Sequence, residues 1–106
     1  MKTYSFSYVN QLGNGEVVEV KDLTSDQEAM LHGRELLEGC VSNYTGQDHW
    51  RADNQDPQIV IDKWADGYPA EETFGTEDEV EPIASACIVA EFSDDHETIK
   101  YKEQGF

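Results

Sequence analysis

One amphipathic helix is the feature that most constrains the fold of this sequence. Over residues 26–38 the apolar residues recur at spacings of three and four, which places them on one side of a helix. These residues are Ala29, Met30, Gly33, Leu36 and Leu37, with Cys40 just beyond them. A single such helix can bury its apolar side only against another element, so the rest of the chain must supply a surface for it.

Local signals predict where this helix begins and ends. Ser25 and Glu28 have the spacing of a capping box, and so do Thr24 and Gln27. Either Thr24 or Ser25 can therefore accept hydrogen bonds from the first free amides of the helix. Gly39 follows the apolar repeat, and glycine is the residue that most often closes a helix. We therefore expect Gly39 to cap a helix that ends near residue 38.

The segment before the helix predicts a β-hairpin. Residues 3–9 alternate, with Tyr4, Phe6 and Tyr8 on one face, as in a strand with one buried face. The Asn14-Gly15 pair that follows is a strong turn signal. Residues 16–21 then form the second strand, in which strict alternation would place Val18 and Val20 on one face and Val17 and Glu19 on the other.

Three further strands are predicted after the helix. Residues 58–64 and 83–92 are rich in β-branched and small apolar residues, which is typical of inner strands. Residues 97–102 alternate and carry two lysines, which is typical of an edge strand. We therefore expect one α+β domain over residues 1–106: an antiparallel sheet of about five strands, in the order ββαβββ, with the amphipathic helix packed on one face.

Charge excludes several classes of function. The chain has 23 Asp and Glu against seven Lys and Arg, which gives a formal net charge of −16. Seven cations cannot neutralise a useful stretch of phosphates, so we expect no direct binding of nucleic acid. The same excess opposes adhesion to an anionic membrane. No apolar run approaches the roughly 18 residues of a membrane span, and no signal peptide is recognisable, so we expect a cytoplasmic protein.

The acids are concentrated in the second half of the chain. From Trp64 to Ile99 there are eleven acids and no Lys or Arg. If the chain there is extended, Glu77, Glu79 and Glu81 project to one side at intervals of about 6.6 Å. This interval is of the same order as the spacing of phosphates along a nucleic-acid strand. Such a segment can occupy a basic groove and gain the counterion release that nucleic acid gains there.

Aromatic residues interleave with these acids, and aromatic anchors surrounded by charge are typical of protein-binding hot spots. We expect Trp64 to be a core residue, whereas Tyr68 and Phe74 are candidate anchors. The helix adds acids on its outer side at Asp26, Glu28, Glu35 and Glu38. The predicted partner-binding residues are Asp66, Tyr68, Glu71, Glu72, Phe74, Glu77, Asp78, Glu79 and Glu81.

No catalytic, metal or cofactor site is predicted. Cys40 precedes His49 by nine residues, and Cys87 precedes His96 by nine, but structural zinc sites take their ligands in closer pairs. We expect both cysteines to be buried thiols. The acids of the 48–56 loop lack the EF-hand pattern, and no nucleophile motif or phosphate-binding glycine loop is present.

In size and charge the chain resembles DNA-mimic anti-restriction proteins, anti-CRISPR proteins and the acidic immunity proteins of nuclease toxins. The resemblance covers composition only. It implies a non-enzymatic inhibitor from a phage or mobile element. Such an inhibitor binds the basic nucleic-acid groove of a host nuclease or CRISPR effector as a DNA or RNA mimic.

Two other readings of the charge remain open. The chain can be an immunity- or antitoxin-like protein that covers one cognate toxin away from its nucleic-acid groove. It can also be a halophilic or accessory acidic protein with no charged partner, because a solvated acidic surface keeps a protein soluble without any specific contact. A monomer and a homodimer formed through the edge of the N-terminal hairpin both remain open as well.

Overall fold

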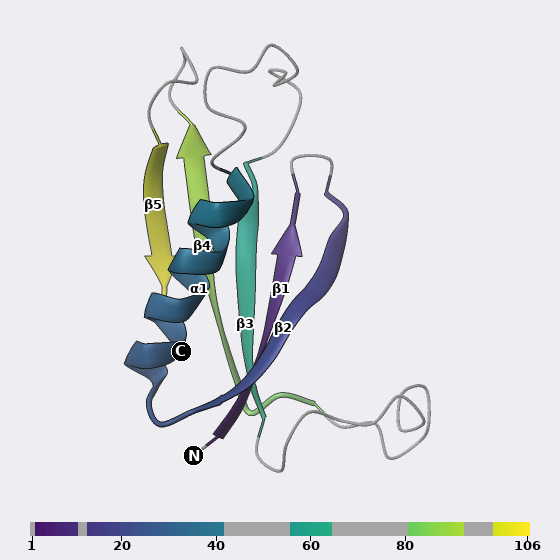
Figure 1. The fold of residues 1–106 in the computed structure, drawn as a ribbon, viewed down its shortest axis with the longest axis vertical. Coiled ribbons are helices and arrows are strands. Elements are labelled where there is room, and N and C mark those ends of the chain that lie inside the picture. The colour runs from purple at the N-terminus through teal and green to yellow at the C-terminus, as the bar shows by residue number, and fades with distance from the viewer. Residues whose placement is uncertain (1, 11–12, 42–55, 65–80, 93–98) are drawn as a thin grey trace.

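Five antiparallel strands form one sheet in the computed structural model, which describes residues 2–10, 13–41, 56–64, 81–92 and 99–106. The elements are β1 (Lys2–Val9), β2 (Gly15–Leu23), α1 (Asp26–Val41), β3 (Gln58–Trp64), β4 (Ala84–Phe92) and β5 (Ile99–Gln104). The strands lie side by side in the order β2-β1-β3-β4-β5. α1 lies across one face of this sheet (Figure 1). The predicted α+β fold, with one helix on an antiparallel sheet, is confirmed.

The core lies between α1 and the middle strands. Phe6 on β1 is opposite Ile61 on β3, and Ile59 is opposite Ile88 on β4. All four side chains are fully buried, and Leu37 of the helix packs into the same cluster. The predicted aromatic face of the first strand is therefore confirmed, and it forms one side of the core.

A capping box begins the helix, as predicted. The Glu28 amide donates a hydrogen bond to Ser25 Oγ at 3.2 Å, and the Thr24 amide donates to Glu28 Oε2 at 3.2 Å. Of the two candidate caps, Ser25 is the one that is used. These bonds satisfy backbone groups that the first turn of a helix leaves without a partner.

The predicted end of the helix is wrong. Gly39 does not cap α1, because the helix continues through Cys40 to Val41. Val41 lies on the side of the helix that faces the sheet and is fully buried in the core, whereas Gly39 lies on the opposite side and is exposed. Burial of the Val41 side chain stabilises the extension of the helix to residue 41. This tertiary contact outweighs the weak local preference of glycine for a helix end.

A β-bulge alters the faces of β2. Phe6 is opposite Glu19, but the next residue, Ser7, is opposite Val17, so the ladder skips Val18. The bulge places Val17 and Val20 together on the face of the sheet that α1 does not cover, beside the alternate residues of β1. The strict alternation expected over 16–21 is therefore wrong.

Trp64 is a core residue, as expected, but it lies on the face away from the helix. Its side chain is 6% exposed, and its indole Nε1 donates a hydrogen bond to Ser5 Oγ at 2.9 Å. Ser5 is itself 1% exposed. This bond satisfies two polar groups that would be costly to bury without a partner.

Two of the expected strand boundaries differ from the structure. β4 begins at Ala84, and Ile83 before it is 54% exposed. β5 covers Ile99–Gln104 and therefore extends two residues further than expected. β5 is an edge strand, as predicted, and Lys100 and Lys102 on it are exposed. Residues 48–55 of the loop considered above for calcium lie outside the described residues.

The two helix glycines should respond in opposite ways to alanine. A Cβ at Gly33 would lie 2.6 Å from Ile61 Cδ1 and 3.2 Å from Ile61 Cγ1, whereas a Cβ at Gly39 meets nothing within 4 Å. Overpacking costs about 1–3 kcal/mol, and alanine in a helix interior gains up to about 1 kcal/mol over glycine. We therefore expect Gly33→Ala to lower the free energy of unfolding by about 1 kcal/mol and Gly39→Ala to raise it. Urea unfolding measures both, and an increase for Gly33→Ala would contradict this packing.

Candidate functional site

One of the nine predicted partner-binding residues, Glu81, lies among the described residues. Asp66, Tyr68, Glu71, Glu72, Phe74, Glu77, Asp78 and Glu79 lie outside the described residues, and Glu81, the ninth, is exposed. The described flanks show where this acidic segment starts and ends. The Ile83 amide donates a hydrogen bond to the Lys63 carbonyl at 2.8 Å, so both ends of the segment are held at the same end of the sheet.

A second acidic region lies on β2 and α1. Seven of the twelve acids in the described residues fall between residues 16 and 38, together with only two of the six bases, Lys21 and Arg34. The other five described acids are offset by four bases. We call these seven acids the β2–α1 surface: Glu16, Glu19, Asp22, Asp26, Glu28, Glu35 and Glu38.

The arrangement of β2 beside α1 brings Glu16 and Glu19 alongside the acids of the helix, whereas Asp22, opposite Thr3, lies on the other face of the sheet. Glu19 on β2 pairs with His32 on the helix, and the negative field of Glu16 reaches Cys40 two turns further along. His32 and Cys40 are eight residues apart and share the flank of α1 that faces β2. The helix-facing acids of β2 therefore run alongside that flank.

The outer side of the helix adds an apolar side chain between two acids. Glu28 and Glu35 are seven residues apart, so they share one helix face, and Leu31 lies between them. Leu31 has the largest exposed fraction, 59%, among the exposed large apolar side chains of the described residues. An exposed apolar side chain beside charged ones suits a hydrophobic contact within a charged interface.

Several acids of this surface are already engaged within the fold. Asp26 Oδ1 accepts hydrogen bonds from Tyr4 Oη at 2.7 Å and from Lys63 Nζ at 2.9 Å. These two donors, Tyr4 first, hold the pKa of Asp26 below its ordinary value. Burial, helped by the neighbouring Asp26 carboxylate, raises the pKa of Tyr4 to about 12. Asp26 is therefore a structural anchor that joins the start of α1 to β1 and β3.

Other acids on the surface also have partners. The side chain and the backbone amide of Thr24 lower the pKa of Glu28 through hydrogen bonds to its carboxylate. Glu38 pairs with Arg34 at 3.2 Å, and the Arg34 guanidinium stacks 4.9 Å from the centre of the Tyr101 ring. Within the described residues, by contrast, Glu16 and Glu35 make no hydrogen bond or ion pair, and both are exposed. These two carboxylates are the ones most available to a partner.

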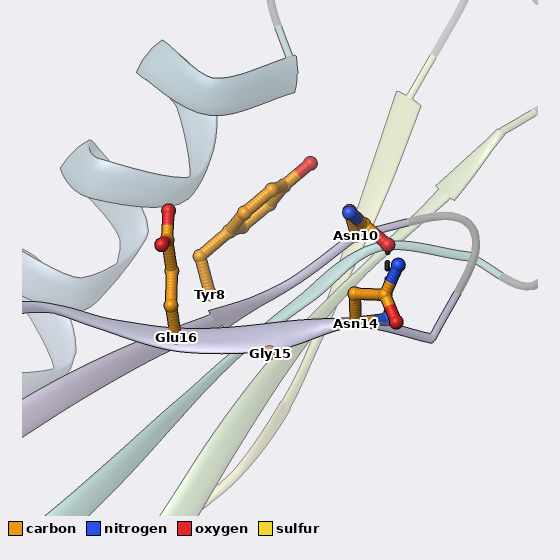
Figure 2. Close-up of a pocket in the computed structure, with 5 residues that line it drawn as sticks. All are labelled: Tyr8, Asn10, Asn14, Gly15 and Glu16. Carbon is orange, nitrogen blue, oxygen red and sulfur yellow. Dashed lines mark hydrogen bonds between the residues drawn. The ribbon is translucent and has the colours of Figure 1, made fainter.

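A shallow hollow of about 260 Å³ lies at the hairpin end of β2. Tyr8, Asn10, Asn14, Gly15 and Glu16 line it, and Figure 2 shows Tyr8 and Glu16 rising on the same side of the hairpin. A carboxylate beside an aromatic ring and amide oxygens suits a cationic side chain. This hollow was not predicted from the sequence, although Glu16 directly follows the Asn14-Gly15 turn signal.

The hairpin turn holds the hollow in shape. Two hydrogen bonds join Asn10 and Asn14. The Asn10 amide donates to the Asn14 carbonyl at 3.0 Å, and the Asn14 amide donates to the side-chain Oδ1 of Asn10 at 3.0 Å. Gly13 has a φ of 86°, a conformation that glycine adopts without strain. The left-handed residue of the turn is thus Gly13, and Gly15 is the first residue of β2.

The two cysteines cannot share a metal ion. Cys40 lies on α1, on the covered face of the sheet, while Cys87 alternates with the buried Ala86 and Ile88 and so lies on the opposite face. Both are free thiols and half-buried, so they are less buried than expected. Burial and the nearby Glu16 raise the pKa of Cys40. His49 and His96 lie outside the described residues, and the described residues contain no group of three His, Cys, Asp or Glu placed to hold a metal.

The chain was compared with protein-family models, curated proteins and solved structures, and none of them matches it. Within the described part of the chain, no helix has the length and apolar character needed to cross a bilayer. The function must therefore be argued from the charges and surfaces described above.

The Asp26 anchor can be tested with Tyr4→Phe, which removes one donor and keeps the ring. We expect the pKa of Asp26 to rise, because the Tyr4 hydroxyl is the largest cause of its depression. A depressed carboxyl pKa stabilises the fold above the unfolded-state pKa of about 4 and loses this effect as the pH falls. The variant should therefore lose up to about 1 kcal/mol at pH 7, and the difference should shrink at pH 3.

An NMR titration of the Asp26 carboxyl and urea unfolding at both pH values measure these effects. Tyr101→Phe is the control, since it removes the same hydroxyl from a half-buried tyrosine that lies beside Arg34 and not beside Asp26. An unchanged Asp26 titration in Tyr4→Phe would show that the hydroxyl does not set this pKa.

Proposed function

We propose that this chain is a non-enzymatic acidic inhibitor. It binds the basic nucleic-acid groove of a nuclease or CRISPR effector and competes there with DNA or RNA. The observation that carries the proposal is the concentration of acids on β2 and α1, where residues 16–38 contain seven acids and only two bases.

The fold supports this use of charge, because the acids lie on regular elements with a packed core behind them. A groove built to bind phosphates attracts a negative surface over long range and releases its counterions on contact. Glu16 and Glu35 have no internal partner among the described residues, so their full charge faces outward. Leu31 adds the apolar contact that charge alone does not provide.

The acidic segment at 65–80 adds six more acids to the chain. Its flanks are held at the end of the sheet where α1 begins, since Lys63, which anchors Asp26 at the start of the helix, also accepts the hydrogen bond from Ile83. We propose that this segment and the β2–α1 surface contact the same partner. Such a partner acts on nucleic acid inside a bacterial cell, so the inhibitor would work in the cytoplasm of the host.

Charge reversal tests the proposal on the described surface. The double variant Glu16→Lys and Glu35→Lys changes the net charge by four units at the two carboxylates of the β2–α1 surface that have no partner among the described residues. Its affinity for the partner should fall at least about tenfold, because the reversed charges repel a basic groove. The readout is retention on a panel of purified CRISPR effectors and restriction nucleases, followed by titration of the one that binds.

A control with the same change of charge is Glu91→Lys with Glu103→Lys on β4 and β5. Because Glu91 pairs with Lys102 at 3.0 Å, circular dichroism checks that this variant still folds. An equal loss in both double variants would mean that only net charge matters, and the β2–α1 surface would then not be the binding site. In parallel, Glu77→Lys, Glu79→Lys and Glu81→Lys together should cut affinity at least about tenfold. No change there would remove the 65–80 segment from the proposed site.

A further inference from the structure

We infer that the outer edge of β2 takes up an extended segment of the partner as an added strand, in which cationic side chains alternate with aliphatic ones. This inference rests on the proposed function, because it assigns the way in which the same basic partner is held. Strand addition at an exposed sheet edge is a recurring mode of recognition, in which backbone hydrogen bonds supply affinity and alternate side chains supply specificity.

The position of β2 leaves its backbone open to such a partner. β2 is an edge strand of the sheet, and among the described strands it pairs only with β1. It is nine residues long and contains no proline, so no residue lacks an amide hydrogen. Figure 1 shows β2 at the margin of the sheet, while α1 lies over the strands on the other side of β1.

The two edges of the sheet differ in their protection. β5 carries the exposed Lys100 and Lys102, and lysines on an edge strand discourage pairing with another chain. β2 has one exposed lysine, Lys21, but it also exposes three valines, Val17, Val18 and Val20, at 46%, 41% and 42%. The bulge at Val18 breaks the ladder locally, so residues 19–23 form the longest regular stretch of this edge.

The side chains of β2 specify the chemistry of the added strand. On the helix side β2 presents Glu16, Glu19 and Lys21, and on the uncovered face it presents Val17, Val20 and Asp22. A paired strand places its alternate side chains directly opposite these two sets. Lysine or arginine opposite Glu16 and Glu19, and valine or isoleucine opposite Val17 and Val20, would match both faces over residues 16–20. Lys21 would repel a further cation, so the match ends there.

The hollow at the hairpin end of β2 offers a further site for a cationic side chain of the added strand. It opens on the same side of the sheet as Glu16, and the Tyr8 ring forms part of its wall. A cationic side chain of the added strand can enter it and meet both the carboxylate and the ring face. A second copy of this chain is a poor occupant, because each copy carries a net charge of −16 and the two would repel each other.

Two nine-residue peptides of the same composition test the inference. One alternates lysine and valine, and the other groups its lysines at one end and its valines at the other. We expect the alternating peptide to bind at least tenfold more tightly by calorimetry. It should also slow hydrogen exchange of amides within β2, because the added strand pairs with that edge.

Variants at the two edges provide matched controls. Val20→Lys and Gln104→Lys each add one positive charge on the uncovered face, the first on β2 and the second on β5. Val20→Lys should lose at least tenfold in affinity for the alternating peptide, and Gln104→Lys should lose much less. Circular dichroism checks that both variants fold.

Peptides N-methylated at alternate residues repeat the test without changing the protein. N-methylation removes the hydrogen-bond donors along one edge of the peptide, so of the two versions one should lose binding and the other should keep it. Equal binding of the alternating and grouped peptides, with no protection of β2, would overturn strand addition and leave the proposed function standing on charge alone. Failure of the alternating peptide to bind at low salt would overturn the inference as well.

Discussion

The close approach of α1 to β3 at Gly33 is the contact on which the rest of the structure depends. A Cβ at this position would lie 2.6 Å from Ile61 Cδ1, so glycine lets the helix backbone lie close to the buried Ile61 without displacing it. The helix is thereby seated over the inner strands, where Leu37 and Val41 complete the core. This placement leaves β2 uncovered at the margin of the sheet, and it turns Glu28, Leu31 and Glu35 outward. The proposed binding surface is thus a consequence of where the core had to be packed.

The sequence predicts the parts of this fold that depend on short-range chemistry. The capping box at Ser25 and the alternation of Tyr4, Phe6 and Tyr8 are local patterns, and the structure confirms both. The end of the helix and the faces of β2 were predicted wrongly, because each is decided by residues distant in sequence. Val41 extends α1 by packing into the core, and the bulge at Val18 exists only in the register between β1 and β2.

The candidate site was predictable in its chemistry but not in its geometry. Composition alone indicates a negative surface, and the helix acids were named from their spacing. Nothing in the sequence distinguishes Asp26, whose charge is held by Tyr4 and Lys63, from Glu35, which faces outward without a partner among the described residues. The hollow at Glu16 requires the hairpin to be folded before Tyr8 and Asn10 meet it. Residues 65–80 lie outside the described residues, so the role of their acids in partner binding stays a prediction from the sequence.

The most direct test of the central claim is competition with nucleic acid on one bound partner. The protein is immobilised, a nuclease or CRISPR effector that binds it is captured, and duplex DNA or rising NaCl is then applied. We predict release by both, with affinity falling about tenfold or more as salt rises to physiological strength. A partner that stays bound in excess DNA would contradict occupation of the nucleic-acid groove and would favour binding of an immunity type, away from that groove.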